Sequence, residues 1–297
     1  MASKSRKKRA RRAILCTLAV CLLLTAAVVV WAHTPAADGL PRILYSYNVL
    51  LVRRSDGAVV RERNADERIY PASMTKIMTA LLALEHNPDL QKTVTITEEM
   101  VELPRQYNAV QAGYLAGENV PVIDLVYGAL LPSGAECCLA LAQDVAGDEQ
   151  SFAELMNERA AELGMTNTHF TNAIGLHDEQ HYTTPRDLAV LLEAALQNPD
   201  FRTAFTSSRY STGPTNLHPD GITVRSSLFE KTGSADFPGG QLLGGKTGYT
   251  DEAGLCLASL AEKDGVEYIL ITAGAGGSNR TAPHHVEDAL AVFSSLN

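Results

Sequence analysis

The sequence predicts an α+β fold, in which an antiparallel sheet is built from both ends of the chain, flanked by helices, with a helical subdomain inserted between its two parts. Alternating strand patterns lie near both ends, at residues 43–62 and 254–273. Helical periodicity dominates the region between them. Runs of strands separated from runs of helices are typical of α+β architecture, and 297 residues of which 45% are hydrophobic can fill one large core.

The first 32 residues differ from the rest in charge and hydropathy. Residues 1–12 carry all of the early basic side chains, namely Lys4, Arg6, Lys7, Lys8, Arg9, Arg11 and Arg12. Residues 13–32 are uncharged and long enough to span a bilayer, which takes about 20 residues. The sequence therefore predicts a cytoplasmic basic tail (1–12), a membrane anchor or signal segment (13–32), a linker (33–41) and an extracytoplasmic domain (42–297). The length favours an uncleaved anchor, and cleavage, which would give a secreted protein, stays open.

The predicted exported part is strongly acidic and contains few cysteines. It holds 18 basic and 34 acidic residues, a net charge of about −16, which argues against nucleic acid or anionic lipid as partners. Cys137 and Cys138 are adjacent and Cys256 stands alone, so the cysteines form no disulfide framework, although a bridge from Cys137 to Cys256 stays open. The histidines at 177 and 181 lie in a predicted loop, which argues against a zinc site.

The elements follow one another as strands, helices and strands again. Residues 43–52 and 58–62 predict a hairpin around a Ser-Asp-Gly turn, a helix begins near Ser73, and 93–96 is strand-like. Helices are predicted at 122–131, 135–146, 151–163 and 185–196, the last one capped by Thr184 with Pro185 in its first turn. After a Gly-, Pro- and Ser-rich stretch from 207 to 240, strands are predicted at 254–261 and 266–273 and a final helix at 284–295.

The tetrad Ser73-Met74-Thr75-Lys76 carries candidate nucleophilic chemistry. On a helix, Ser73 and Lys76 share a face, so an amine with a lowered pKa can take the proton of the hydroxyl. The alternative is a helix N-cap at Ser73 and a solvated lysine. Ser5-Arg6-Lys7-Lys8 has the same spacing in the basic tail, which shows that the tetrad needs partners elsewhere.

Two further clusters are candidates for such partners. Lys246-Thr247-Gly248 lies on a predicted edge strand, where a cation, a hydroxyl and a residue without side-chain bulk suit an extended peptide that ends in a carboxylate. Lys231-Thr232-Gly233 has the same letters but a loop-like context. Ser133-Gly134 lies between two predicted helices, where a helix N-cap is the simpler interpretation.

In this order and separation the three clusters resemble the active-site motifs of the penicillin-binding protein and serine β-lactamase superfamily. Over residues 43–295 the chain is most similar to the serine D-alanyl-D-alanine carboxypeptidases, the low-molecular-mass penicillin-binding proteins. The similarity includes Phe170-Thr171-Asn172, Gly175-Leu176-His177-Asp178 and Gly245-Lys246-Thr247-Gly248-Tyr249-Thr250. It implies acyl-enzyme chemistry without a cofactor, peptidoglycan stem peptides ending in D-Ala-D-Ala as substrate, and β-lactam antibiotics as acylating inhibitors.

The resemblance also implies a role for each matched residue. Ser73 would be the nucleophile, Lys76 its general base and Ser133 a proton relay to the leaving amine. Lys246 and Thr247, with Gly248, would hold the substrate carboxylate. The amides of Ser73 and Tyr249 would form the oxyanion hole. Arg280 is a candidate second partner for the carboxylate, and His177 and Asp178 match a loop near the site, where a purely structural role is as well supported.

One position departs from the family pattern. The middle motif is Ser-X-Asn, and here Ala135 takes the place of the asparagine, so a side-chain hydrogen bond is lost. Three readings stay open: Glu136 or a water replaces the amide, turnover is reduced, or the protein binds muropeptides or penicillin with little turnover. A cell-wall DD-endopeptidase or transpeptidase is a further alternative. A serine β-lactamase is disfavoured because no Glu-X-X-Leu-Asn loop is present.

Overall fold

The computed structural model describes residues 17–18, 20–22, 24–25, 36 and 38–296. The predicted tail (1–12) lies outside these residues, as does much of the predicted anchor (13–32), of which 17–18, 20–22 and 24–25 are helical. Within the described part of the chain, none of the helices combines the length and the apolar character that a membrane crossing requires. The chain separates into two units, Met1–Leu44 and Tyr45–Asn297. The second unit contains all the candidate site residues.

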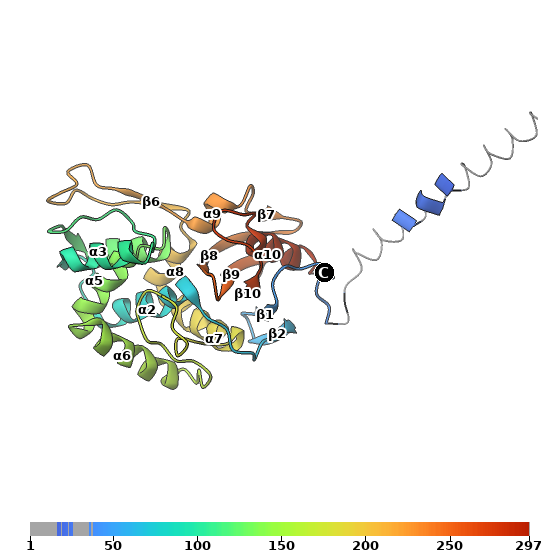
Figure 1. Cartoon of the computed structure of the whole chain (residues 1–297), viewed down its shortest axis with the longest axis horizontal. Helices are drawn as coiled ribbons and strands as arrows, with labels where there is room; N and C mark the ends of the chain where they lie inside the picture. Colours follow the sequence, from blue (N-terminus) through green and yellow to red (C-terminus); the bar gives the residue numbers. More distant parts are fainter. Residues whose placement is uncertain (1–16, 19, 23, 26–35, 37, 297) are drawn as a thin grey trace, which may run out of the picture. The chain divides into compact units, whose positions relative to one another are not determined.

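The second unit is built on a six-stranded antiparallel sheet in the order β2-β1-β10-β9-β8-β7. Its strands are β1 (Asn48–Arg53), β2 (Ala58–Arg63), β7 (Asp236–Phe237), β8 (Gly240–Thr250), β9 (Gly254–Lys263) and β10 (Val266–Ala275). β1 pairs with β10, with Asn48 opposite Ala273. The sheet is thus assembled from both ends of the chain, as predicted (Figure 1).

Helices cover the sheet and fill the region between β2 and β8 (Figure 1). They are η1 (Ala72–Thr75), α2 (Lys76–His86), α3 (Glu98–Gln106), α4 (Val122–Leu130), α5 (Ala135–Ala146), α6 (Glu149–Glu162), α7 (Pro185–Leu196), α8 (Pro199–Thr206), α9 (Ser227–Lys231) and α10 (His284–Ser294). Two short antiparallel pairs complete the strands: β3 (Thr93–Thr95) pairs with β4 (Asn119–Pro121) across α3, and β5 (Arg209–Ser211) pairs with β6 (Thr223–Arg225). This confirms the inserted helical subdomain.

Local sequence signals explain several element ends. Thr184 caps α7 by accepting a hydrogen bond from the Asp187 amide, and Gly147 ends α5 with a φ of 85°. The turn between β9 and β10 places Asp264 and Gly265 at φ values of 51° and 78°, the backbone of a type I′ turn. β9 is buried at nearly every position, because both faces of the central sheet are covered by helices.

The structure corrects some predicted boundaries. The first strand begins at Asn48 rather than residue 43, because the carboxylate of Asp288 accepts the amides of Tyr45 and Ser46 and holds them out of the sheet. The Gly-, Pro- and Ser-rich stretch from 207 to 240, in which no element is predicted, contains β5, β6, α9 and β7. Cys137, Cys138 and Cys256 are buried free thiols, so the bridge left open between Cys137 and Cys256 is not formed.

Candidate active site

Ser73 and Lys76 lie where η1 passes into α2. The Lys76 ammonium donates to the Ser73 hydroxyl over 2.9 Å and to the Ile174 carbonyl over 2.6 Å. Ser73 is in a 3₁₀ turn rather than an α-helix, and its side chain caps neither helix. The N-cap alternative is therefore wrong, and so is the solvated lysine, since Lys76 is only 2% exposed.

Burial sets the electrostatics of this pair. Desolvation lowers the pKa of Lys76, against smaller opposing effects of Cys138 and Glu136. The uncharged amine is the form that can accept a proton from Ser73. The environment of Lys76 therefore favours a base beside a hydroxyl.

The loop of residues 172–176 holds the carbonyl that contacts Lys76. The side-chain oxygen of Asn172 accepts the amides of Ile174, Gly175 and Leu176 and so fixes the loop. Gly175 has a φ of 81°, and a Cβ there would lie 1.9 Å from the Ala72 carbonyl oxygen. Only glycine lets this loop lie against the turn that carries Ser73.

Gly175→Ala is expected to lower the free energy of unfolding by about 2–5 kcal/mol, since it adds a left-handed backbone penalty to an overlap that forces the loop away from η1. Gly164→Ala is the matched control, because Gly164 has a φ of 78° and open space around its Cβ position. It should cost only about 1 kcal/mol. Urea unfolding measures both, and equal costs would contradict the proposed close contact.

His181 supports the same turn from the other side. Its Nδ1 accepts the Thr171 amide over 2.9 Å, so Nε2 carries the proton and donates to the Thr75 hydroxyl over 2.8 Å. Burial lowers the pKa of His181 to about 4, so the ring is neutral. Sequence reasoning missed this contact and the role of Asn172, although an Asn three residues before a Gly is a turn signal.

Ser133 lies between α4 and α5 in a left-handed backbone conformation, with a φ of 79°. Its hydroxyl accepts a hydrogen bond from Lys246 over 2.9 Å. The N-cap of α5 is Gly134, without any side-chain cap, so the N-cap interpretation of Ser133 is wrong. A non-glycine residue in this region of φ/ψ is strained, and such strain is characteristic of functional sites.

Lys246, Thr247 and Gly248 lie on β8, whose outer edge is paired with β7 only at its beginning. Lys246 is buried, and desolvation, followed by repulsion from Lys76, lowers its pKa well below the usual value. The Thr247 hydroxyl is 2.7 Å from the Ser227 hydroxyl. A Cβ on Gly248 would lie 3.3 Å from the Ser73 amide nitrogen, so β8 runs directly past the serine.

The remaining predicted residues are less closely joined to this group. The backbone of Tyr249 continues β8 beyond Gly248, while its hydroxyl bonds to Asp251. Arg280 is exposed in the loop after β10, and among residues 38–296 its side chain has no hydrogen bond or ion pair. His177 packs edge-on against Tyr70, and its Nδ1 lies 3.8 Å from Glu252. The structure thus brings together Ser73, Lys76, Ser133, Lys246, Thr247 and Gly248, but not Arg280.

Residues 37–277 match the peptidase S11 family, described as D-alanyl-D-alanine carboxypeptidase. The chain belongs to this family. It is 32% identical over 228 residues to the D-alanyl-D-alanine carboxypeptidase DacF of Bacillus subtilis, covering 77% of this chain but 57% of that protein. The chain thus spans little more than half of that relative. Arg280 lies beyond the matched residues.

One Streptomyces sequence and one Streptomyces crystal structure, both from strain K15, are similar to this chain over nearly their whole length. A D-alanyl-D-alanine carboxypeptidase is 31% identical over 264 residues, which are 86% of this chain and 89% of that protein. The crystal structure of a Streptomyces DD-transpeptidase superposes with a TM-score of 0.75 at 28% identity and covers 85% of this chain and 97% of that one. These likenesses confirm the fold class and the family predicted from the motifs.

Ala135 stands where the resemblance predicts an asparagine, and Glu136 does not take the place of that side chain. One carboxylate oxygen of Glu136 accepts the amides of Ala112 and Gly113, and the other is buried without a hydrogen-bond partner. Burial raises the pKa of Glu136. Glu136 therefore fixes the loop beside Ser133, and its carboxylate makes no bond to either lysine.

Proposed function

We propose that this protein is a penicillin-sensitive serine D-Ala-D-Ala carboxypeptidase that removes the terminal D-Ala of peptidoglycan stem peptides through an acyl-enzyme. The observation that carries the proposal is the pair of lysine–hydroxyl contacts, Lys76 with Ser73 and Lys246 with Ser133, which meet beside an open strand edge. A family of this description and a peptidase-like fold support it.

In the acylation step, neutral Lys76 takes the proton of Ser73 as its oxygen attacks the carbonyl of the D-Ala-D-Ala bond. The amides of Ser73 and Tyr249 stabilise the oxyanion. Collapse of the intermediate breaks the peptide bond, and a proton passes through Ser133 to the leaving amine of D-Ala. Thr247 and Lys246 hold the terminal carboxylate. Water then attacks the acyl-serine and releases the shortened peptide.

Mass spectrometry of the full chain tests this function. Incubation with benzylpenicillin should add one adduct, mapped to the peptide that contains Ser73, and a pentapeptide ending in D-Ala-D-Ala should lose one D-Ala. Adduct formation without release of D-Ala would instead support the binding protein with little turnover. Release from cross-linked dimers alone would support the endopeptidase.

The pH dependence of the acylation rate is expected to follow the deprotonation of Lys76. Because desolvation lowers its pKa below 10.5, the neutral amine becomes populated at a lower pH than for a free lysine. The acylation rate should therefore rise with pH, with its midpoint below the value for a free lysine. Stopped-flow measurement with a chromogenic β-lactam gives the profile, and a midpoint at the free-lysine value would contradict the assignment of Lys76 as the base.

Ala135→Asn is expected to raise the rate of D-Ala release by about 10-fold or more, because it restores a donor beside the reacting carbonyl. Ala135 is fully buried, so the larger side chain should also cost about 1–3 kcal/mol of stability. Ala135→Leu is the matched control, with similar bulk and no amide. If the leucine variant also releases D-Ala faster, or the asparagine variant does not, the missing asparagine does not limit turnover.

We further propose that residues 13–32 anchor the protein and place its catalytic unit on the outer face of the membrane. The seven basic residues before an uncharged segment support this orientation. Membrane fractionation and N-terminal sequencing of the mature protein distinguish an anchor from a cleaved signal.

A further inference from the structure

A cavity of about 140 Å³ lies outside the catalytic group, between α9, the start of β9 and the N-terminus of α10. It is lined by Lys231, Leu255, Ser278, Asn279, Thr281, Pro283 and His285. A water molecule occupies about 30 Å³ in the liquid, so the cavity has room for a small organic molecule. None of its residues has a role in the mechanism above.

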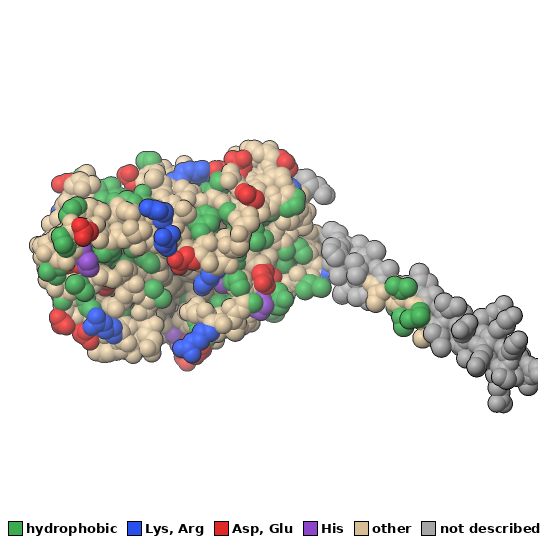
Figure 2. All heavy atoms as spheres, turned by 90° about the horizontal axis from the view of Figure 1, so that it is seen from above, with side chains coloured by type: hydrophobic (Ala, Val, Ile, Leu, Met, Phe, Trp, Pro, Cys, Tyr) green, Lys and Arg blue, Asp and Glu red, His purple; other side chains and the backbone are tan. Residues whose placement is uncertain are grey.

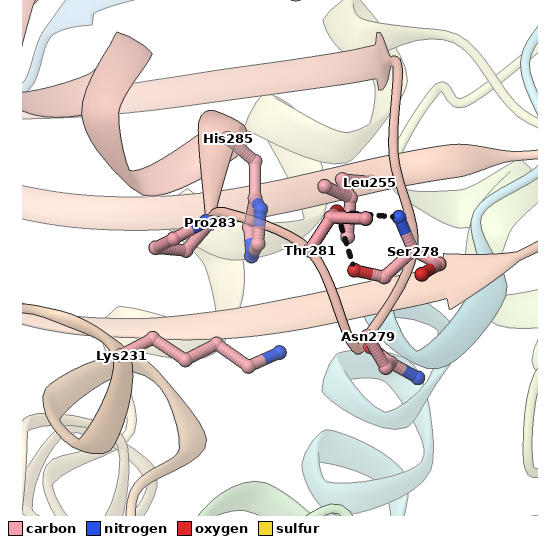
Figure 3. Close-up of a pocket in the computed structure, with 7 residues that line it drawn as sticks. All are labelled: Lys231, Leu255, Ser278, Asn279, Thr281, Pro283 and His285. Carbon is pink, nitrogen blue, oxygen red and sulfur yellow. Dashed lines mark hydrogen bonds between the residues drawn. The ribbon is translucent and has the colours of Figure 1, made fainter.

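Two polar side chains of this cavity, those of His285 and Lys231, lack hydrogen-bond partners among the described residues, whereas Ser278 and Thr281 bond to each other. His285 is 1% exposed, and neither of its ring nitrogens has a hydrogen-bond partner. A buried polar group without a partner costs about 1–3 kcal/mol. The Lys231 ammonium has no hydrogen bond or ion pair within the described part of the second unit. Figure 3 shows the His285 ring and the Lys231 side chain reaching toward the same space, with Asn279 near the Lys231 ammonium.

The groups around the cavity favour a negatively charged ligand. Lys231 supplies a cation, the ring of His285 supplies an N–H, and the first turn of the eleven-residue helix α10 contributes the positive end of its dipole. No aspartate or glutamate lines the space. Leu255 and Pro283 add apolar walls that suit a few carbon atoms.

The strand register places this cavity next to the strand residues Lys246 and Thr247. Ser227 and Lys231 are four residues apart on α9 and share a face, and the Ser227 hydroxyl contacts that of Thr247. Leu255 is paired with Tyr249, two residues from Thr247 and therefore on the same face of the sheet. Lys246 feels the charge of Lys231 as one of the causes that lower its pKa.

We propose that this cavity is a second carboxylate-binding site, which takes a small carboxylate of amino-acid size through Lys231 and His285. The choice of D-alanine as the first probe rests on the proposed function, since D-alanine is the released product there. The same carboxylate has two possible sources: free D-alanine, or the end of a peptide that still carries D-Ala. Occupancy would place a negative charge next to Lys231 and so change the field at Lys246.

The test is an NMR saturation-transfer titration of the full chain in detergent. The protein is first acylated at Ser73 by benzylpenicillin, so that the candidate active site with Lys246 and Thr247 is occupied. The probes are D-alanine, acetate and an N-acetylated dipeptide ending in D-Ala. Lys231→Met and His285→Phe should each weaken binding by about 10-fold or more, whereas Lys92→Met, an exposed lysine paired with Asp144, should not change it. Preference for D-alanine over the dipeptide identifies the free product as the source.

The absence of binding by every probe at about 50 mM, a concentration that detects a Kd in the millimolar range, would overturn the proposal. Equal affinity in the wild-type, Lys231→Met and His285→Phe proteins would do the same. If His285→Phe fails to fold by circular dichroism, Asn279→Ala on the exposed loop replaces it, with the same expected direction. The Ser73→Ala chain gives the same Lys231-dependent titration without acylation, so failure of the peptidase assignment leaves this test intact.

Discussion

Ser73→Ala is expected to abolish covalent labelling by fluorescent penicillin and to lower D-Ala release by about 10⁴-fold or more, since loss of a serine nucleophile removes the acyl-enzyme route. The prediction rests on geometry, because the Ser73 hydroxyl accepts the hydrogen bond of Lys76 and strand β8 runs past Ser73 at Gly248. Labelling followed by gel fluorescence and D-Ala release measure the two effects.

Ser5→Ala is the matched control for this prediction. Ser5 has a lysine three residues later, as Ser73 does, but it belongs to the basic tail. Its replacement should leave labelling unchanged. Persistent labelling of the Ser73→Ala protein, with the adduct mapped elsewhere, would contradict the identity of the nucleophile.

Lys76→Met is expected to slow acylation by about 10²–10⁴-fold, the usual contribution of a general base. Methionine fills a similar buried volume without an amine, so the fold should survive, at a cost of about 1–3 kcal/mol for the Ile174 carbonyl that loses its donor. Lys76→Arg should be slow as well, because a guanidinium stays charged and accepts no proton. Stopped-flow acylation separates this effect from weakened binding.

A surface lysine provides the comparison for Lys76. Lys92 is half exposed and pairs with Asp144, away from the serine. Lys92→Met should retain the wild-type acylation rate. A wild-type rate in Lys76→Met would transfer the base role to another group, with Lys246 the nearest candidate on chemical grounds.

The sequence predicts those parts of the fold that local signals determine. The helices at 135–146 and 185–196 begin and end where predicted, because Gly147, Thr184 and Pro185 mark their ends. The helix at 199–206 and the hairpin of β5 and β6 were not predicted, since β5 and β6 are three residues long and stand in a Gly-, Pro- and Ser-rich stretch.

In the candidate site, too, local sequence predicts some features and not others. Short motifs identify Ser73, Lys76 and Lys246, whereas their contacts are set by residues distant in the chain. The Ile174 carbonyl lies 98 positions from Lys76, and Ser133 lies 113 positions from Lys246. No local pattern encodes such pairs, and the left-handed backbone at Ser133 is likewise fixed by tertiary structure.

The surface of the second unit agrees with its acidic composition. On the face shown in Figure 2, Lys and Arg side chains occur in small groups close to Asp and Glu rather than as a continuous basic field. This face therefore offers no extended positive field that would attract a polyanion such as nucleic acid.

The pairing of β1 with β10 also determines when the candidate site can be completed during synthesis. Asn48 pairs with Ala273, so the central ladder joins segments separated by most of the chain. Such long-range pairing slows folding, and β8, which carries Lys246, is joined to β1 only through β9 and β10. During synthesis Ser73 and Lys76 emerge long before the strands that place Lys246 beside Ser133. Ser73 therefore meets the strand that carries Lys246 only after the chain has been synthesised through β10.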